Sequence, residues 1–248
     1  DLNHAPFNFK LFKQHWNAGA YRWLIDNYDR EVGNDYVPIY VLGNHDSGRV
    51  VSRYGVKQAR LLAMLEMTLR GQVYIYQGEE IGMHDVFIPD DKKQDPSGKL
   101  ESSLNRDPQR TPMQWNSDKY SGFSNVETWL PIADDYQTNN VQLQWDDPKS
   151  MLSLYRQLIA LRKSSKVLLE GSYQSFGDDN YFGFWRELDG EKIVIILNYA
   201  DYDLTVNVGH GTGNIFISTY LDKKDQVNLS AINLRAFEGL IIKLIDSN

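Results

Sequence analysis

Residues 37–49 read VPIYVLGNHDSGR and are the most informative stretch for the fold. The apolar run Val37–Leu42 predicts a short buried strand, and the glycines on either side of the polar residues mark breaks in regular structure. His45 and Asp46 therefore follow the end of a strand. Taken alone, this pair favours a capped turn over a reactive site, because Asn and Asp bond readily to nearby backbone groups.

The segments around this strand alternate between helix and strand. Apolar residues at helical spacing predict a helix over Asn17–Glu31, and residues 57–70 (KQARLLAMLEMTLR) predict a second helix that Gly71 ends. Val73–Tyr76 is the next predicted strand. This alternation is typical of a parallel α/β architecture.

Residues 84–147 lack regular periodicity and are rich in polar residues and proline. A loop region of this length is usually functional or disordered. Aromatic residues recur along it, which predicts that it is ordered and packed: Phe87, Trp115, Tyr120, Phe123, Trp129, Tyr136 and Trp145. Residues 150–163 (SMLSLYRQLIALRK) then predict a long helix.

The sequence pattern changes after Ser165. Short runs of β-branched and aromatic residues, separated by Gly, Asp or Asn, predict the strands of an antiparallel β domain: Tyr181–Glu187, Lys192–Asn198, Leu204–Val208, Ile215–Thr219 and Gly239–Leu244. We therefore expect two parts, residues 1–165 and residues 166–248.

The composition excludes several classes of protein. The 248 residues carry a formal net charge of −7 with no long basic run, so a nucleic-acid partner is not expected. The absence of cysteine excludes disulfides and thiolate metal sites within the chain. Neither a membrane-spanning segment nor a signal peptide is expected from the apolar patterning. Aromatic residues make up 12%, which suits sugar rings but more often reflects core packing.

Four motifs occur in a characteristic order: PFNF at 6–9, LGNHD at 42–46, YQGEEIGM at 76–83 and RDPQRTPMQW at 106–115. In this order and spacing the chain resembles the α-amylase superfamily of glycoside hydrolases, in its maltase and oligosaccharide α-glucosidase branch. The resemblance implies the C-terminal part of a (β/α)8 TIM barrel followed by an antiparallel β-sandwich. It places PFNF at the sixth barrel strand, NHD at the end of the seventh, and GEEIGM just after the eighth.

The first five strands of such a barrel are absent from this sequence, and with them the nucleophile and the acid/base of the family. Three strands alone would expose two sheet edges and an unfilled barrel interior. The expected partner is therefore the missing N-terminal barrel half, as a separate chain or as the rest of a longer polypeptide. No cofactor is expected here, although the resemblance allows a structural Ca²⁺ in that missing half.

The resemblance assigns site residues one by one. Asp46 is the expected catalytic residue, a third carboxylate that binds two hydroxyls of the glucosyl unit and favours the distorted transition state. His45 is expected to donate to the same hydroxyls, and the strand-end position supports both assignments because TIM-barrel sites lie there. Arg106 is expected on a hydroxyl of the non-reducing-end glucose, with Arg110 as a further substrate-binding candidate.

Other charged residues have simpler interpretations. Arg106 pairing with Asp107 or Asp95, to hold the long loop in place, is the alternative to substrate binding. Glu79 and Glu80 are expected to be structural, because neighbours in an extended segment point to opposite faces. Asp90, Asp91 and Asp95 resemble a calcium cluster only loosely and are expected to be solvated charges.

The expected function is retaining hydrolysis of terminal α-linked glucose from maltose-, sucrose- or oligosaccharide-type substrates. The alternative is a catalytically inactive homologue, such as a transporter-associated heavy chain or a receptor-type protein. A carbohydrate-binding module made from the β domain is less favoured, because its aromatic residues alternate as core residues do. A secreted or extracellular membrane-anchored location is expected, and Asn228 opens an N-glycosylation triplet. Ser47 and Gly48 depart from the bulkier residues common after NHD in the family.

Overall fold

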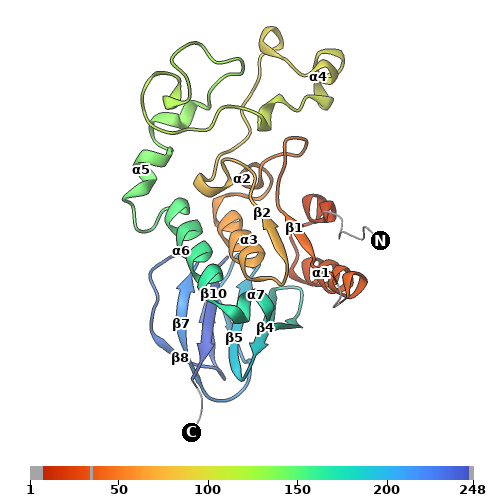
Figure 1. The fold of residues 1–248 in the computed structure, drawn as a ribbon, viewed down its shortest axis with the longest axis vertical. Helices are drawn as coiled ribbons and strands as arrows, with labels where there is room; N and C mark the ends of the chain where they lie inside the picture. Colours follow the sequence, from red (N-terminus) through yellow and green to blue (C-terminus); the bar gives the residue numbers. More distant parts are fainter. Residues whose placement is uncertain (1–7, 34–35, 246–248) are drawn as a thin grey trace. The chain divides into compact units, whose positions relative to one another are not determined.

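The computed structural model describes residues 8–33 and 36–245 of the chain (Figure 1). These residues divide into two compact units. The first comprises the described residues within 1–41, 60–74 and 156–248, and the second comprises residues 42–59 and 75–155. The expected division at residue 165 remains a prediction about domains.

The first unit contains a pair of parallel strands, as the alternating pattern predicts. Strands β1 (Ile39–Val41) and β2 (Gln72–Tyr74) pair with Tyr40 opposite Val73. Helix α1 (Ala18–Val32) precedes β1, and the side chain of Asn17 caps it by accepting from the backbone amide of Ala20 at 2.8 Å. Both strands are shorter than predicted.

The PFNF motif is only partly visible in the structure. Pro6 and Phe7 lie outside the described residues, so the expected sixth strand is not tested there. Phe9 begins a short 3-10 helix, η1 (Phe9–Lys13), which Asn8 caps. The Asn8 backbone amide donates to the carbonyl of Ile39 at 3.1 Å, so the chain at this point lies beside β1.

Helix α3 (Val56–Thr68) ends three residues before Gly71, slightly earlier than predicted. Gly71 has a φ of +128°, and a Cβ added there would lie 2.3 Å from the carbonyl oxygen of Pro38. Only glycine fits this close approach between the turn before β2 and the residue before β1. Gly71 therefore permits the turn into β2, while the helix ends before it.

The β domain is a sandwich of two antiparallel sheets. The first sheet has the order β3-β4-β5-β10-β7-β8, and the second pairs β6 with β9. Side chains from both sheets form one buried cluster, which includes Val194 and Ile196 from the first sheet and Ile232 from the second. The bounds are β3 Ser172–Gly177, β4 Tyr181–Leu188, β5 Glu191–Asn198, β6 Leu204–Val206, β7 Thr212–Ser218, β8 Gln226–Asn228, β9 Ile232–Leu234 and β10 Gly239–Leu244.

Five of these strands were predicted, and β3, β8 and β9 were missed. Strands β8 and β9 have only three residues each, too few to show an alternating pattern. Helix α7 (Lys166–Glu170) was also missed, because its five residues are too few to show helical spacing of apolar residues. β3 reads SYQSFG, in which serine, glutamine and glycine hide the strand.

Helices of the first unit cover one face of the larger sheet. Helix α1 packs on β3 and β4, and α7 packs on β4 and β5. The hydroxyls of Tyr173 and Ser175 donate to the Asp26 carboxylate of α1 at 2.8 and 2.7 Å. Arg186, fully buried in β4, donates to the backbone carbonyls of Gly171 and Ser172. Polar contacts therefore bind the sheet to the helices, in addition to apolar packing.

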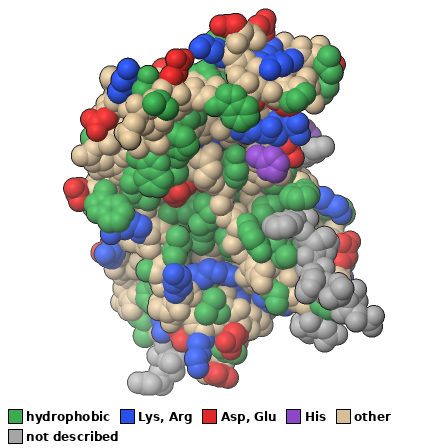
Figure 2. Space-filling model, turned by 45° about the horizontal axis from the view of Figure 1, so that its top comes forward, with side chains coloured by type: hydrophobic (Ala, Val, Ile, Leu, Met, Phe, Trp, Pro, Cys, Tyr) green, Lys and Arg blue, Asp and Glu red, His purple; other side chains and the backbone are tan. Residues whose placement is uncertain are grey.

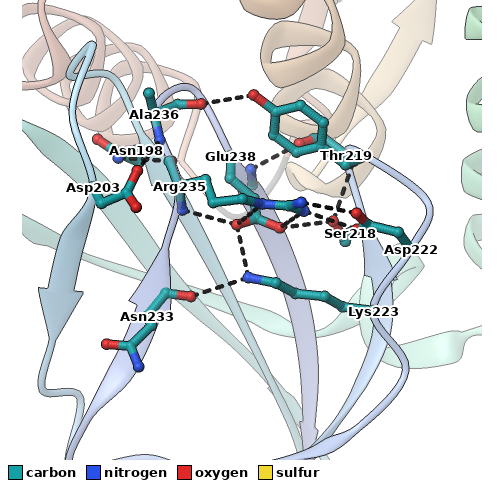
Figure 3. Close-up of polar contacts among 12 residues, drawn as sticks. Asn198, Asp203, Ser218, Thr219, Asp222, Lys223, Asn233, Arg235, Ala236 and Glu238 are labelled. Atoms are coloured by element: carbon teal, nitrogen blue, oxygen red, sulfur yellow. Dashed lines mark hydrogen bonds and ion pairs between the residues drawn. The ribbon is translucent and has the colours of Figure 1, made fainter.

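A buried carboxylate joins the hairpins at one end of the β domain (Figure 3). Glu238 is fully buried and accepts from Lys223 Nζ at 2.8 Å, from Ser218 Oγ at 2.9 Å and from the Arg235 guanidinium at 2.6 Å. Arg235 also forms a two-pronged pair with Asp222 at 2.8 Å. Burial raises the pKa of Glu238, but these donors lower the pKa more, so the net shift is downward.

The second unit consists mainly of loops and short helices, including the predicted long loop. Aliphatic residues form its small apolar clusters: Val86, Ile88 and Ala133 in one, and Ile81, Met83, Met113 and Leu152 in the other. The helices here are α2 Val50–Tyr54, η2 Glu79–Ile81, η3 Asp90–Lys92, α4 Pro96–Leu100, η4 Ser102–Leu104, η5 Asp107–Gln109, η6 Lys119–Gly122, η7 Asp134–Gln137 and α5 Val141–Trp145. Helix α6 (Met151–Ser164) follows, as predicted.

The prediction that the loop's aromatic residues are packed was wrong for most of them. Phe87 and Trp129 are 85% and 75% exposed. Trp115, Phe123 and Trp145 are also exposed. Large hydrophobic side chains reach the surface on the face shown in Figure 2. Side-chain hydrogen bonds to backbone, such as Gln114 Nε2 to the Asn139 carbonyl at 2.7 Å, organise the loop instead. Across the described ranges, every helix is too short or too polar to cross a bilayer.

Candidate functional site

His45 and Asp46 occupy a tight turn that follows β1. The turn is closed by a bridge between Asn44 and Ser47, and the Asn44 side chain accepts from the backbone amide of Asp46 at 2.9 Å. This is the local bonding expected of a capped turn. Asn44 therefore shapes the turn, while the side chains of His45 and Asp46 remain available for other contacts.

All four predicted site residues meet at the carboxylate of Asp46. Arg106 Nη1 lies 3.2 Å and Arg110 Nη2 lies 2.9 Å from Asp46 Oδ1. His45 Nε2 lies 3.3 Å from Oδ2 of the same carboxylate, and Arg110 Nε donates to the His45 carbonyl at 2.8 Å. The Asp46 side chain remains 44% exposed, which leaves it room to accept a ligand hydroxyl. We call these four residues the Asp46 cluster.

Arg106 pairs with Asp95 and so holds the long loop, as the alternative interpretation expects, and it also reaches Asp46; its binding of substrate stays a prediction. Its Nε and Nη2 donate to the two oxygens of Asp95 at 2.8 and 2.9 Å, and its backbone amide donates to Asp95 as well. The hydrogen bond from Arg106 lowers the pKa of Asp95, and the Asp95 carboxylate raises the pKa of Arg106. The guanidinium is therefore fixed in place and charged beside Asp46.

One expectation about the nearby acids was wrong, although Asp90 and Asp91 are exposed as expected. Asp95 is not a solvated charge, since its side chain is fully covered and caps α4 by accepting from the Ser97 amide. Of the two acids expected as loop partners of Arg106, Asp95 takes this role and Asp107 does not. Asp107 is buried and accepts from the backbone amides of Gln94 and Asp95. Across residues 8–33 and 36–245, acidic and histidine side chains form no group of three that could hold a metal.

Arg49 is a structural residue of this site that the sequence interpretation missed. It is 2% exposed, and its Nη1 and Nη2 donate to the carbonyls of Gln77 and Gln109 at 2.6 and 2.9 Å. Its backbone amide donates to Asp85 at 2.9 Å. Burial lowers the pKa of Arg49. Arg49 thus joins the segment after the NHD turn to the strand-end loop and to the loop that carries Arg110. Its position three residues after Asp46 was the only feature of the sequence that could have pointed to a role of Arg49 in this site.

Glu79 is structural, as predicted, but for a different reason. Glu79 and Glu80 lie in the 3-10 helix η2 (Glu79–Ile81) and not in an extended segment. The argument that neighbouring side chains of a strand point to opposite faces therefore does not apply to them. Glu79 is buried, and its Oε2 accepts from the Tyr76 amide at 3.2 Å. A Cβ added at Gly43 would lie 2.5 Å from Glu79 Oε1, so the glycine of GNHD makes room for this carboxyl. Burial raises the pKa of Glu79 to about 8.

This raised pKa predicts how Glu79→Gln changes stability with pH. In the unfolded chain the carboxyl titrates near 4.5, so between that pH and about 8 the folded state keeps a proton that the unfolded state has released. Stability therefore falls as pH rises through this window. Glu79→Gln removes this titration. The free energy of unfolding of the variant minus that of wild type should therefore increase from pH 5 to pH 8. Urea unfolding at both values measures this.

Glu127→Gln is the matched control, because the Glu127 side chain is 74% exposed. Its effect on the free energy of unfolding should be the same at both pH values. A Glu79→Gln variant that also shows no change between the two pH values would mean that Glu79 titrates normally in the folded protein.

A parallel strand pair with its helices, followed by an antiparallel β domain, is the fold expected for the C-terminal part of a (β/α)8 barrel protein, and comparison with known proteins agrees. The family model described as the alpha amylase catalytic domain matches residues 2–171. The chain belongs to this family and is related to its maltases, alpha-glucosidases and oligo-1,6-glucosidases. It covers part of the catalytic domain and the C-terminal region.

Curated relatives extend well beyond the matched region. Maltase A1 of Drosophila melanogaster is 35% identical over 236 residues, which cover 90% of this chain and 41% of that protein. The alpha-glucosidase of Apis mellifera is 32% identical, and the match covers 82% of this chain and 38% of that protein. The oligo-1,6-glucosidase of Parageobacillus thermoglucosidasius is 30% identical, and the match covers 92% of this chain and 46% of that protein. The chain thus spans less than half the length of these relatives.

Solved structures match the fold over most of the chain. The trehalulose synthase of Pseudomonas mesoacidophila MX-45 aligns with a TM-score of 0.82 at 26% identity, covering 92% of this chain and 47% of that one. The isomaltulose synthase of Klebsiella sp. LX3 aligns with a TM-score of 0.85 at 24% identity, covering 96% and 50%. The expected fold, the C-terminal part of the barrel followed by an antiparallel β domain, is confirmed.

Proposed function

We propose that the full-length protein is a retaining α-glucosidase and that this chain supplies the transition-state-stabilising side of its site. The observation that supports this proposal is the convergence of Arg106, Arg110 and His45 on the half-exposed carboxylate of Asp46. The names of the related maltases and alpha-glucosidases support a terminal α-linked glucose as the substrate.

The chemistry divides between two parts of the protein. In a retaining reaction one carboxylate attacks the anomeric carbon while an acid protonates the leaving oxygen, and water then releases the bound sugar. No motif of this chain supplies those two groups, so they come from the missing barrel half. Asp46 accepts from the glucosyl hydroxyls, and its negative charge favours the positively charged, flattened ring over the ground state.

The arginines give this carboxylate a defined position. Arg106 is held by Asp95, and Arg110 is held by the carbonyl of His45, so neither guanidinium has to be ordered when the substrate binds. A preorganised site stabilises the transition state without reorganising at the moment of reaction. The guanidinium groups also offer donors to sugar hydroxyls at the rim of the site.

Exposed apolar residues beside the barrel strands support a partner half. Val37 precedes β1 and is 51% exposed, and Tyr74 in β2 is 47% exposed. A parallel sheet is normally covered on both faces, so two paired strands with exposed apolar residues suit burial against further strands. The rest of the barrel, in the same polypeptide or in another chain, is the proposed partner.

An aryl α-glucoside assay tests this proposal. The full-length polypeptide should release the aryl group with net retention, whereas the 248-residue chain expressed alone should show no turnover. Turnover by the short chain alone would contradict the division of the site. A folded full-length protein without any turnover would instead identify an inactive homologue. An extracellular location is part of the same proposal, and a mass shift at Asn228 after deglycosylation would support it.

A further inference from the structure

The two sheets of the β domain differ in width, which leaves part of the larger one uncovered. Six strands face only two, and the buried cluster forms where β5, β10 and β7 meet β6 and β9. On the same face, side chains of the neighbouring strands β3 and β4 are only partly buried. A hollow of about 360 Å³ lies there, and Phe176, Tyr181 and Trp185 belong to its lining. We call it the β-domain hollow.

The rings of Phe176, Tyr181 and Trp185 form a continuous surface. Gly183 has no side chain, so the Phe176 ring can lie between the other two rings. Gly183 lies between Tyr181 and Trp185 on β4 and pairs with Phe176 on β3. A Cβ added at Gly183 would lie 2.3 Å from the Phe176 ring, so this ring occupies the space above the glycine. The Phe176 centroid is 6.1 Å from that of Trp185 and 6.3 Å from that of Tyr181. The rings are thus in contact along the hollow.

Polar groups at the same place are free to bind a hydroxylated molecule. Within the described residues, the Gln174 amide, the Tyr181 hydroxyl and the Trp185 indole nitrogen make no hydrogen bond with the protein. The Asn207 side chain uses its oxygen to accept from the Gly209 amide at 2.9 Å, which leaves its amide nitrogen as a donor. The hollow therefore combines apolar ring faces with amide and hydroxyl groups.

The lining carries no charged side chain, although 24% of the residues in the chain are charged. An anionic ligand or a nucleic acid would need lysine or arginine at this place. A sugar ring needs neither, since it has an apolar face that packs on aromatic rings and hydroxyls that pair with amides. The volume is at the small end of ligand sites, which suits one or two sugar units.

We propose that the β-domain hollow binds glucosyl units of a neutral α-glucan at a second site, which shares no residue with the Asp46 cluster. The choice of α-glucan over other neutral sugars rests on the proposed function. Binding at a second site on the same molecule raises the effective concentration of the polymer at the first, without any change in the chemistry. Small substrates that cannot span both sites gain nothing from it.

Affinity electrophoresis of the full-length polypeptide in native gels that contain amylopectin tests the proposal. All variants carry Asp46→Asn, so that the glucan is not consumed. The Asp46→Asn parent should be retarded, and Trp185→Ala and Tyr181→Ala should each weaken the apparent affinity by about tenfold, in line with the stacking of a ring on an aromatic face. Tyr202→Ala is the matched control, because Tyr202 is a 52% exposed tyrosine of the same domain outside the hollow.

Two further variants keep the test decisive if loss of an aromatic ring unfolds the domain. Gln174→Ala removes only a free amide, and Asn207→Ala removes an amide together with the acceptor of the Gly209 backbone amide in a surface turn. Both should weaken retardation by several-fold, with far-UV circular dichroism unchanged. Equal retardation of the parent, Trp185→Ala and Gln174→Ala would overturn the proposal, and so would a parent that amylopectin does not retard. Aryl α-glucoside turnover, measured with Asp46 intact, should be the same with and without Trp185→Ala, which separates this test from that of the first site.

Discussion

Asp46→Asn in the full-length polypeptide should lower kcat for an aryl α-glucoside by about 10²–10³-fold, the usual effect of losing one preorganised electrostatic contact to a transition state. The amide keeps the shape of the side chain but removes the negative charge that favours a positively charged ring. Because the ground-state sugar is neutral, KM should change much less than kcat. Steady-state kinetics measures both constants.

The same variant should remain folded. Asp46 is 44% exposed at its side chain, and the hydrogen bond that closes its turn comes from its backbone amide. Its thermal unfolding midpoint should therefore stay close to that of wild type. Asp91→Asn makes the same chemical change at an exposed acid of the long loop and should leave kcat unaltered. Unchanged turnover in Asp46→Asn would remove the role proposed for this residue.

Arg49→Ala should lower the free energy of unfolding by about 3–5 kcal/mol, the range found when one partner of a buried charged contact is removed. The change leaves the carbonyls of Gln77 and Gln109 without their donors in a region where water does not reach the guanidinium. It also leaves a cavity beside Tyr76, over whose ring the guanidinium lies at 5.3 Å. Urea unfolding of the full-length protein measures the loss.

Arg49→Lys separates charge from geometry. Lysine keeps the positive charge but is a single point donor, so it cannot reach both carbonyls in the planar arrangement of the guanidinium. It should lose about 1–3 kcal/mol. Arg30→Ala, at an exposed arginine of α1, should change the free energy of unfolding by less than about 0.5 kcal/mol. If Arg49→Ala unfolds at the same urea concentration as wild type, the segments it joins are held together by other contacts.

Elements with a strong periodic pattern were predictable. The helices α1, α3 and α6 and the strands β4, β5 and β10 appear where the spacing of apolar residues predicts them, because that spacing records which face of each element is buried. The three-residue strands β8 and β9 were not predicted, since each is defined by pairing with a neighbouring strand and is too short to show a pattern of its own. β9 is an example, formed by pairing with β6.

The aromatic residues of the long loop show a different limit. Their regular recurrence suggested a packed interior, yet Trp129 and Phe87 are largely exposed. Hydrophobicity predicts burial only where regular structure brings a second apolar surface close, and a loop provides no such repeat. The buried positions of the loop are taken largely by polar residues such as Asp95, Asp107 and Gln114, which backbone groups can satisfy.

The sequence by itself determined the alternation of helix and strand, the place of GNHD after β1, and the family, because these depend on short-range spacing and on motif order. Only the tertiary structure decided which side chains meet Asp46. Arg106 and Arg110 lie 60 and 64 positions further along the chain, and the path of the intervening loop depends on hydrogen bonds between distant residues. The burial of Arg49 and the hollow beside Trp185 arise in the same way. Contacts of this kind are properties of the folded surface, and the local sequence does not record them.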